Sequence, residues 1–226
     1  MTELPLKGTL RRLLVEGDLE AVAEMAATKK RVLGSLVALA FDADEEIGWR
    51  AVEAMGMGAE RLSAGSPRFV KEHMRRLYWL ITEESGACFW RAPESMAELG
   101  VRLPGLLKDF VPIAFHLLET LEEEDLEHFR PGAIYAVGRL AGVLPRELPS
   151  LLPRVVEALD DPDPQARGMA VWCLGQVRET SPLQEREGLL QDQGPVRLYR
   201  NRVLEHMTVG RLAQEVLEEA TSVTGS

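Results

Sequence analysis

The chain has 226 residues, of which 46% are hydrophobic and 27% charged, so it can bury a core in one large domain or two small ones. Its formal net charge of −10 disfavours broad binding to phosphate backbones, which requires clustered lysine and arginine. No apolar run approaches the roughly 18 residues that span a bilayer, so no membrane association is expected.

The N-terminal region, residues 1–30, predicts a pair of capping helices at about 4–15 and 17–28. It lacks the basic-then-apolar layout of a signal peptide, because Glu3 precedes Arg11 and Arg12. A short basic cluster, Lys29-Lys30-Arg31, then marks a junction between helices.

Residues 31–207 predict a series of helical hairpins, because apolar residues recur there at three- and four-residue spacing between acidic turns. The hairpins are expected at 31–62, 67–101, 104–143 and 146–179. A degenerate fifth begins at 182, with Val196-Arg197 in its arginine position. A polar helix at 208–220 closes the series and 221–226 form a disordered tail, so 1–226 is expected to be one continuous domain.

An internal repeat underlies these hairpins. Trp49–Glu53 and Trp90–Glu94 share the pattern W-R-A-x-E, 41 residues apart, and a period near 40 is typical of stacked helical repeats. An arginine follows each acidic turn, and small residues follow each arginine, which allows close packing between helices. The arginines are Arg50, Arg91, Arg130 and Arg167, and the later small residues include Gly58, Gly100, Gly138 and Gly175.

This combination of acidic turn, arginine and small-residue helix resembles the HEAT repeat. The resemblance implies an all-α fold, a right-handed α-solenoid of about five helical hairpins whose second helices line a concave face. The run W-R-x-P-E at Trp90–Glu94 also looks like a segment of an uncharacterised HEAT-repeat family of anaerobic bacteria, and that likeness implies no activity.

The repeated arginines are expected to be structural, because in HEAT-like stacks the matching arginine bonds the acidic turn. Glu53 and Glu94 occupy a position where the later repeats carry Ala133 and Ala170, so both glutamates should be partly buried and paired. The hypothesis is a charge ladder in which Glu53 reaches Arg91 and Glu94 reaches Arg130.

The segment Glu83–Glu94 is less regular than a plain HEAT turn, since it holds Gly86, Cys88, Phe89 and Trp90. Phe89, Trp90 and Cys88 either pack in the core or form a ligand or partner site with Glu84. Nucleophilic catalysis by Cys88 is disfavoured, because no histidine lies within ten residues on either side. Cys88 and Cys173 show no pairing pattern and indicate reduced thiols in a cytoplasm.

No metal or other cofactor is expected. Deoxyhypusine hydroxylases are HEAT-repeat enzymes that hold two irons with His-Glu pairs, whereas the pairs here run Glu-His and lie at unlike places in the repeat. They are Glu72-His73, Glu127-His128 and Glu205-His206, and His116 is the remaining histidine. The acidic run 119–127 lacks the ligand order of a calcium loop and predicts a solvated turn.

The sequence therefore predicts a non-catalytic scaffold or adapter that binds another protein on the concave face of its repeats. The expected contacts are Glu84, Trp90, Met96, His128, Tyr135 and Arg139. Two alternatives stay open. One is an enzyme or an assembly factor for a cofactor protein, with a pocket near Glu83–Glu94. The other is nucleic-acid binding, which would require arginine and lysine gathered on one face.

Overall fold

Helices make up most of the computed structural model, which describes residues 5–82, 91–110, 127–143 and 148–224. Contacts divide the chain into two compact units where the sequence predicts one continuous domain. The first unit comprises 1–111 together with Tyr199–Leu204, and the second comprises 112–198 together with Glu205–Ser226. None of the helices in the described ranges is both long enough and apolar enough to cross a membrane.

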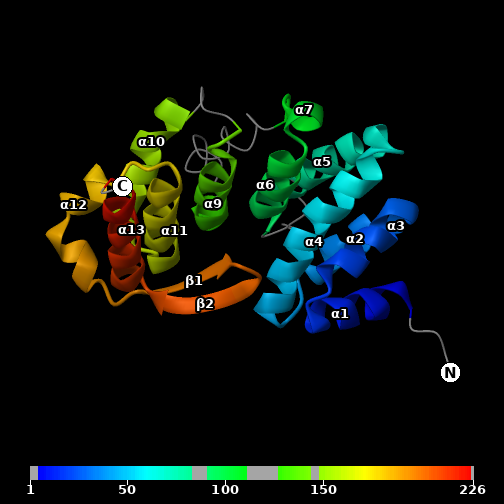
Figure 1. Cartoon of the computed structure of the whole chain (residues 1–226), viewed down its shortest axis with the longest axis horizontal. Helices are drawn as coiled ribbons and strands as arrows, with labels where there is room; N and C mark the ends of the chain where they lie inside the picture. The colour runs from blue at the N-terminus through cyan, green and yellow to red at the C-terminus, as the bar shows by residue number, and fades with distance from the viewer. Residues whose placement is uncertain (1–4, 83–90, 111–126, 144–147, 225–226) are drawn as a thin grey trace. The chain divides into compact units, whose positions relative to one another are not determined.

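The first unit is a set of paired helices (Figure 1). α4 packs against α2, α3 and α6, and α5 packs against α6, so α4 lies at the centre of the contacts. Aspartates begin two of the helices, as the acidic turns predict: Asp18 accepts a hydrogen bond from the Ala21 amide and Asp44 from the Glu46 amide. The helices are α1 (Leu6–Glu16), α2 (Leu19–Thr28), α3 (Arg31–Leu39), α4 (Glu45–Ser63), α5 (Pro67–Thr82), α6 (Ala92–Arg102) and α7 (Pro104–Leu107).

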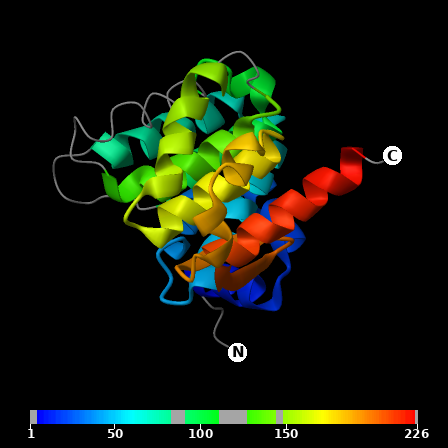
Figure 2. The ribbon, with the colours of Figure 1, turned by 90° about the vertical axis from the view of Figure 1, so that its left-hand side faces the viewer.

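The second unit places α11 between α9 and α13 (Figure 1), and α13 runs on as a long helix toward the C-terminus (Figure 2). Its helices are α9 (Arg130–Leu140), α10 (Leu148–Glu157), α11 (Pro164–Gln176), α12 (Ser181–Gln184) and α13 (Val209–Thr224), with 3-10 turns η1 (Glu127–Phe129), η2 (Ala158–Asp160) and η3 (Glu187–Gln191). The helical hairpins predicted at 31–62, 67–101 and 146–179 agree with these bounds. The final helix continues through 221–224, where the sequence predicts a disordered tail.

A β-hairpin replaces the predicted fifth helical repeat. Strands β1 (Pro195–Arg200) and β2 (Val203–Thr208) pair with each other, so the Val196-Arg197 pair and His206 lie in strands. Between the strands, Asn201 and Arg202 adopt φ values of 52° and 66°, as a two-residue type I′ turn requires. The physical reason lies in the first four residues of β1, where buried Val196 and Leu198 alternate with exposed neighbours at the period of a strand, which overrides the repeat register.

The small residues predicted to allow close helix packing do so at several positions. A Cβ on Gly58 would lie 2.7 Å from Cβ of Ala26, and one on Gly138 would lie 2.8 Å from the ring of Trp172. A Cβ on Gly138 would also lie 3.0 Å from the Cα of Cys173, a backbone atom that cannot rotate away. The approach of α9 to α11 therefore depends on glycine at 138.

Gly138→Ala is expected to lower the free energy of unfolding by about 1–3 kcal/mol, because the added methyl group pushes α9 away from α11. Gly142→Ala is the matched control, since nothing lies within 4 Å of its added Cβ. Urea denaturation followed by tryptophan fluorescence measures the difference. Equal stability of the two variants would show that α9 and α11 have room for a side chain at 138.

Candidate functional site

The structure places two of the predicted binding residues in the core rather than on a surface. Met96 is fully buried, and Tyr135 is buried with its ring stacked on Trp172 at a centroid distance of 4.9 Å. The reason is register: both face inward on helices that are buried nearly all round. His128 is exposed beside Phe129, and Arg139 is half-buried. Glu84 and Trp90 lie outside the described residues, together with Cys88.

The first two repeated arginines have different partners. Arg50 donates to the carbonyl oxygens of Leu14 and Val15 at 3.0 and 3.2 Å and forms an ion pair with Glu46. Arg91 instead lies over the ring of Trp49, with its guanidinium carbon 4.7 Å from the centroid.

The later arginines bind acidic turns. Arg130 pairs with Asp161. Arg167 donates to the carbonyl oxygens of Asp161 and Pro162 and makes two hydrogen bonds to the Asp192 carboxylate, at 2.7 and 3.1 Å. The Arg167 guanidinium holds the pKa of Asp192 below its usual value.

Glu53 has partners other than the Arg91 of the predicted charge ladder. The hydroxyl of Tyr199 donates to Glu53 at 2.7 Å, and Nε of Arg202 donates at 3.3 Å. The ring of Tyr199 also stacks on Trp49 at 5.5 Å. Burial and the Glu53 hydrogen bond raise the pKa of Tyr199. Glu53 therefore anchors the turn of the β-hairpin, a role that no local sequence pattern indicates.

Glu94 is buried in the first unit, whereas Arg130, its partner in the predicted charge ladder, belongs to the second unit. The Oε2 atom of Glu94 has no hydrogen-bond partner among the described residues. Burial raises the pKa of Glu94 to about 7, and the nearby charge of Arg91 only partly opposes that effect. Glu94 is thus an acid whose charge is poorly compensated.

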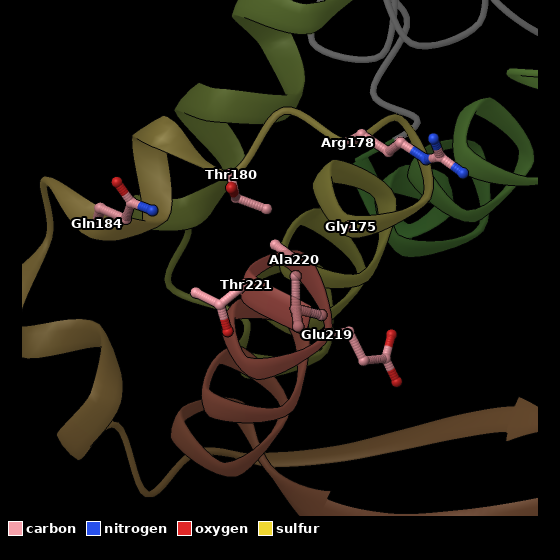
Figure 3. A pocket seen from close by; sticks show the side chains of 8 residues that line it. Gly175, Arg178, Thr180, Gln184, Glu219, Ala220 and Thr221 are labelled. Atoms are coloured by element: carbon pink, nitrogen blue, oxygen red, sulfur yellow. The ribbon is translucent and has the colours of Figure 1, made fainter. Parts of the chain in front are cut away.

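A cavity of 510 Å³ lies in the second unit beside α13 (Figure 3). The C-terminal end of α11, the residues at the two ends of the short helix α12 and the C-terminal half of α13 line it. Val216 and Ala220 give it an apolar wall, and the close approach of Val216 to α11 requires glycine at 175, where a Cβ would lie 2.9 Å away. The lining residues are Gly175, Arg178, Thr180, Gln184, Val216, Glu219, Ala220 and Thr221.

The polar groups of this cavity occupy two sides. Arg178 and Glu219 extend to one side, whereas Gln184 lies on the other (Figure 3). Within the part of the chain that the structure describes, no ion pair or side-chain hydrogen bond engages Arg178. The cavity therefore offers an apolar wall with a cation, an anion and an amide around it.

Arg178 has a backbone conformation that favours glycine, with φ of 59°. It follows the end of α11 in a turn closed by the hydrogen bond from the Glu179 amide to the Leu174 carbonyl at 2.9 Å. An arginine in this left-handed position costs about 1 kcal/mol relative to glycine. A large cationic side chain thus lines the cavity where the backbone alone would favour glycine, and strain of this kind is often found at functional sites.

Two of the thiol and imidazole groups that the structure describes, those of Cys173 and His73, are buried. Burial raises the pKa of the Cys173 thiol to about 12, so this cysteine is inert as a nucleophile. His73 is buried, and burial lowers its pKa to about 4. No group of three metal-ligating side chains occurs within residues 5–82, 91–110, 127–143 and 148–224.

One curated relative matches about half of the chain. The chain is similar to an uncharacterised protein of Archaeoglobus fulgidus, 26% identical over 126 residues. That match covers 56% of this chain and 63% of the archaeal protein, so it spans less than two thirds of the relative.

Three solved structures match most of the chain, all with TM-scores below 0.5. One is a designed armadillo repeat protein for modular peptide recognition (17% identity, TM-score 0.47, 95% of this chain and 99% of that one). Another is a designed armadillo repeat protein in complex with the peptide (KR)4 (17%, 0.46, 93% and 97%). The third is a HEAT-like repeats protein from Thermococcus onnurineus (19%, 0.41, 98% and 82%).

The family model described as HEAT-like repeat matches residues 127–177. This range contains α9, α10 and α11, with Arg130 and Arg167 bound to the acidic turns. The chain is therefore a helical-repeat protein that contains a HEAT-like repeat.

Proposed function

We propose that this protein is a non-catalytic binding module for another protein, and that the cavity beside α13 receives an apolar side chain of the partner. The observation that carries the proposal is Arg178, a strained, exposed arginine at the edge of a cavity with an apolar wall. Helical-repeat proteins commonly bind partners through surfaces between their helices.

The chemistry of the cavity suits a short stretch of polypeptide. An aliphatic or aromatic side chain would pack on Val216 and Ala220, which supplies most of the binding energy. Arg178 and the amide of Gln184 can hydrogen-bond to the carbonyl groups that flank such a side chain, and Glu219 can pair with a neighbouring cation. None of the lining residues is a histidine or a cysteine, so the hydroxyl groups of Thr180 and Thr221 have no imidazole among the lining residues to activate them.

A reducing compartment, such as the cytoplasm, fits this proposal. Cys173 is a buried free thiol on α11 that lies close to Gly138 of α9, so it has no access to an oxidising partner.

Filling the cavity is expected to abolish partner binding. Ala220→Trp places an indole in the cavity. The amount of partner captured from native lysate should therefore fall at least about tenfold relative to the wild-type protein. Arg178→Ala should weaken the same capture by about tenfold, because a charge-assisted hydrogen bond contributes about 1.5–3 kcal/mol. Quantitative mass spectrometry of the eluates, followed by titration with the purified partner, measures both effects.

Glu218→Trp is the matched control, because it adds the same indole to α13 at an exposed residue that does not line the cavity. Retention of the partner by Glu218→Trp and its loss in Ala220→Trp would support the proposal. Equal retention by both variants would show that partners bind elsewhere on the repeats.

A further inference from the structure

Helix α5 of the first unit has a basic outer face, which we define as Arg68, Lys71, Arg75, Arg76 and Trp79. These residues recur at three- and four-residue spacing, so they follow neighbouring lines along one side of the helix. Arg68 and Arg76 are exposed, and Lys71 and Arg75 are half-buried. The side chain of Trp79 is 62% exposed, which is unusual for so large an apolar group.

Aromatic rings are interleaved with the cations around this face. The Arg75 guanidinium lies over the ring of Phe110 at 5.5 Å, and the Lys30 ammonium lies over Phe69 at 5.4 Å. Lys30 belongs to the cluster Lys29-Lys30-Arg31 at the junction of α2 and α3, and Lys29 and Arg31 are exposed as well. The basic surface therefore extends beyond α5, and its aromatic groups hold the long cationic side chains in place.

The charge of the chain is distributed unevenly in a way that favours this face. The first unit carries as many basic as acidic residues, so the whole net charge of −10 falls on the second unit. Within α5 Glu72 is the only acidic residue, and it forms an ion pair with Arg75. Arg68, Lys71 and Arg76 remain available to an anionic partner, since no ion pair engages them among the described residues.

We propose that the basic face of α5 binds single-stranded nucleic acid. Arg68, Lys71 and Arg76 would contact successive phosphates, and the exposed ring of Trp79 would stack on an unpaired base at the end of this row. A row of cations that ends in an exposed aromatic ring is the arrangement that tracks a single strand. A duplex would leave Trp79 without a base to stack on, and an acidic polypeptide would make no use of its flat face.

Fluorescence anisotropy with a labelled thymidine oligonucleotide of about 12 nucleotides tests the proposal. Wild-type protein should bind at about 50 mM salt and lose affinity steeply by about 200 mM. Changing Arg68, Lys71 and Arg76 together to glutamine should weaken binding by about 30-fold or more and reduce the salt slope by about 2, since each phosphate contact contributes about 0.7. Trp79→Ala should weaken binding by roughly 5- to 100-fold, the effect of losing one stacked base.

The matched control changes Arg12, Arg154 and Arg211 to glutamine, three arginines with exposed side chains that lie outside this face. It alters the net charge of the chain by the same amount, so a difference between the two triple variants reports position rather than overall charge. Circular dichroism of every variant shows whether its helices are retained.

Three results would overturn the proposal. Wild-type protein could fail to bind the oligonucleotide at low salt, or the two triple variants could bind equally well. Poly-glutamate could also displace the oligonucleotide with equal efficiency from wild-type protein and from Trp79→Ala, which would assign the face to acidic polypeptides. Because the basic face and the cavity beside α13 share no residue, Ala220→Trp should bind the oligonucleotide like wild type, and each proposal can fail alone.

Discussion

Glu94→Gln is expected to raise the free energy of unfolding of the first unit by about 3 kcal/mol at a pH of about 8. Burial raises the pKa of Glu94 from 4.5 to about 7, and each pKa unit corresponds to about 1.4 kcal/mol. A raised pKa means that the folded state binds the proton more tightly than the unfolded state. The contribution of Glu94 to stability is therefore fully present below pH 4.5 and is lost as the pH rises through about 7.

Hydrogen exchange of the α6 amides, converted to opening free energies at each pH, measures this effect locally. Wild-type protein should lose protection between pH 4.5 and about 7, whereas Glu94→Gln should not. Glu98→Gln is the control, because Glu98 lies one turn further along α6 and is 3.8 Å from Arg102, so removing its charge should not stabilise the unit. Parallel profiles for wild type and Glu94→Gln would show that Glu94 is well solvated.

Arg167→Met is expected to destabilise the second unit by about 2–3 kcal/mol near neutral pH. The change leaves the Asp192 carboxylate without its cation and removes donors from two backbone carbonyls, those of Asp161 and Pro162. Because Arg167 lowers the pKa of Asp192, the contribution of this pair is present above the unfolded pKa of 3.8 and is lost as the pH falls. The effect of the substitution should therefore shrink in acid.

Urea denaturation of the second unit at several pH values measures this loss. Arg154→Met is the control, because Arg154 forms an exposed i,i+3 pair with Glu157 and should cost less than about 1 kcal/mol. A cost that is the same for Arg167→Met and Arg154→Met, or that grows in acid, would contradict a structural role for the Asp192 pair.

Much of the helical arrangement could be predicted from local pattern, because each helix needs an apolar stripe, a capping residue and space for its neighbour. Asp44 ahead of α4 and Gly138 in α9 show this, since cap and close approach both leave a mark in the sequence. Burial of individual residues was harder to predict. Met96 and Tyr135 have the residue types of binding contacts, yet α6 and α9 are buried on more sides than an amphipathic stripe suggests.

The features that local pattern could not predict depend on contacts between residues far apart or on special backbone conformations. Glu53 is paired with Tyr199, 146 residues later in the chain, and neither residue indicates the other. Arg178 adopts a positive φ without the glycine that usually signals it. The cavity beside α13 forms where α12 and α13 meet the end of α11, a junction that occurs outside the repeated pattern.

The first unit can be completed only late in synthesis, because it includes the turn of the β-hairpin. Residues 199–204 belong to that unit, although the ribosome makes them long after the rest of it. Trp49 and Glu53 can form their contacts with the ring and hydroxyl of Tyr199 only after Tyr199 has been synthesised. Bringing together residues so far apart in the chain is slow compared with helix formation. A nascent chain that ends before Tyr199 would expose an unstacked indole and an unpaired carboxylate on α4, so this surface becomes complete only near the end of translation.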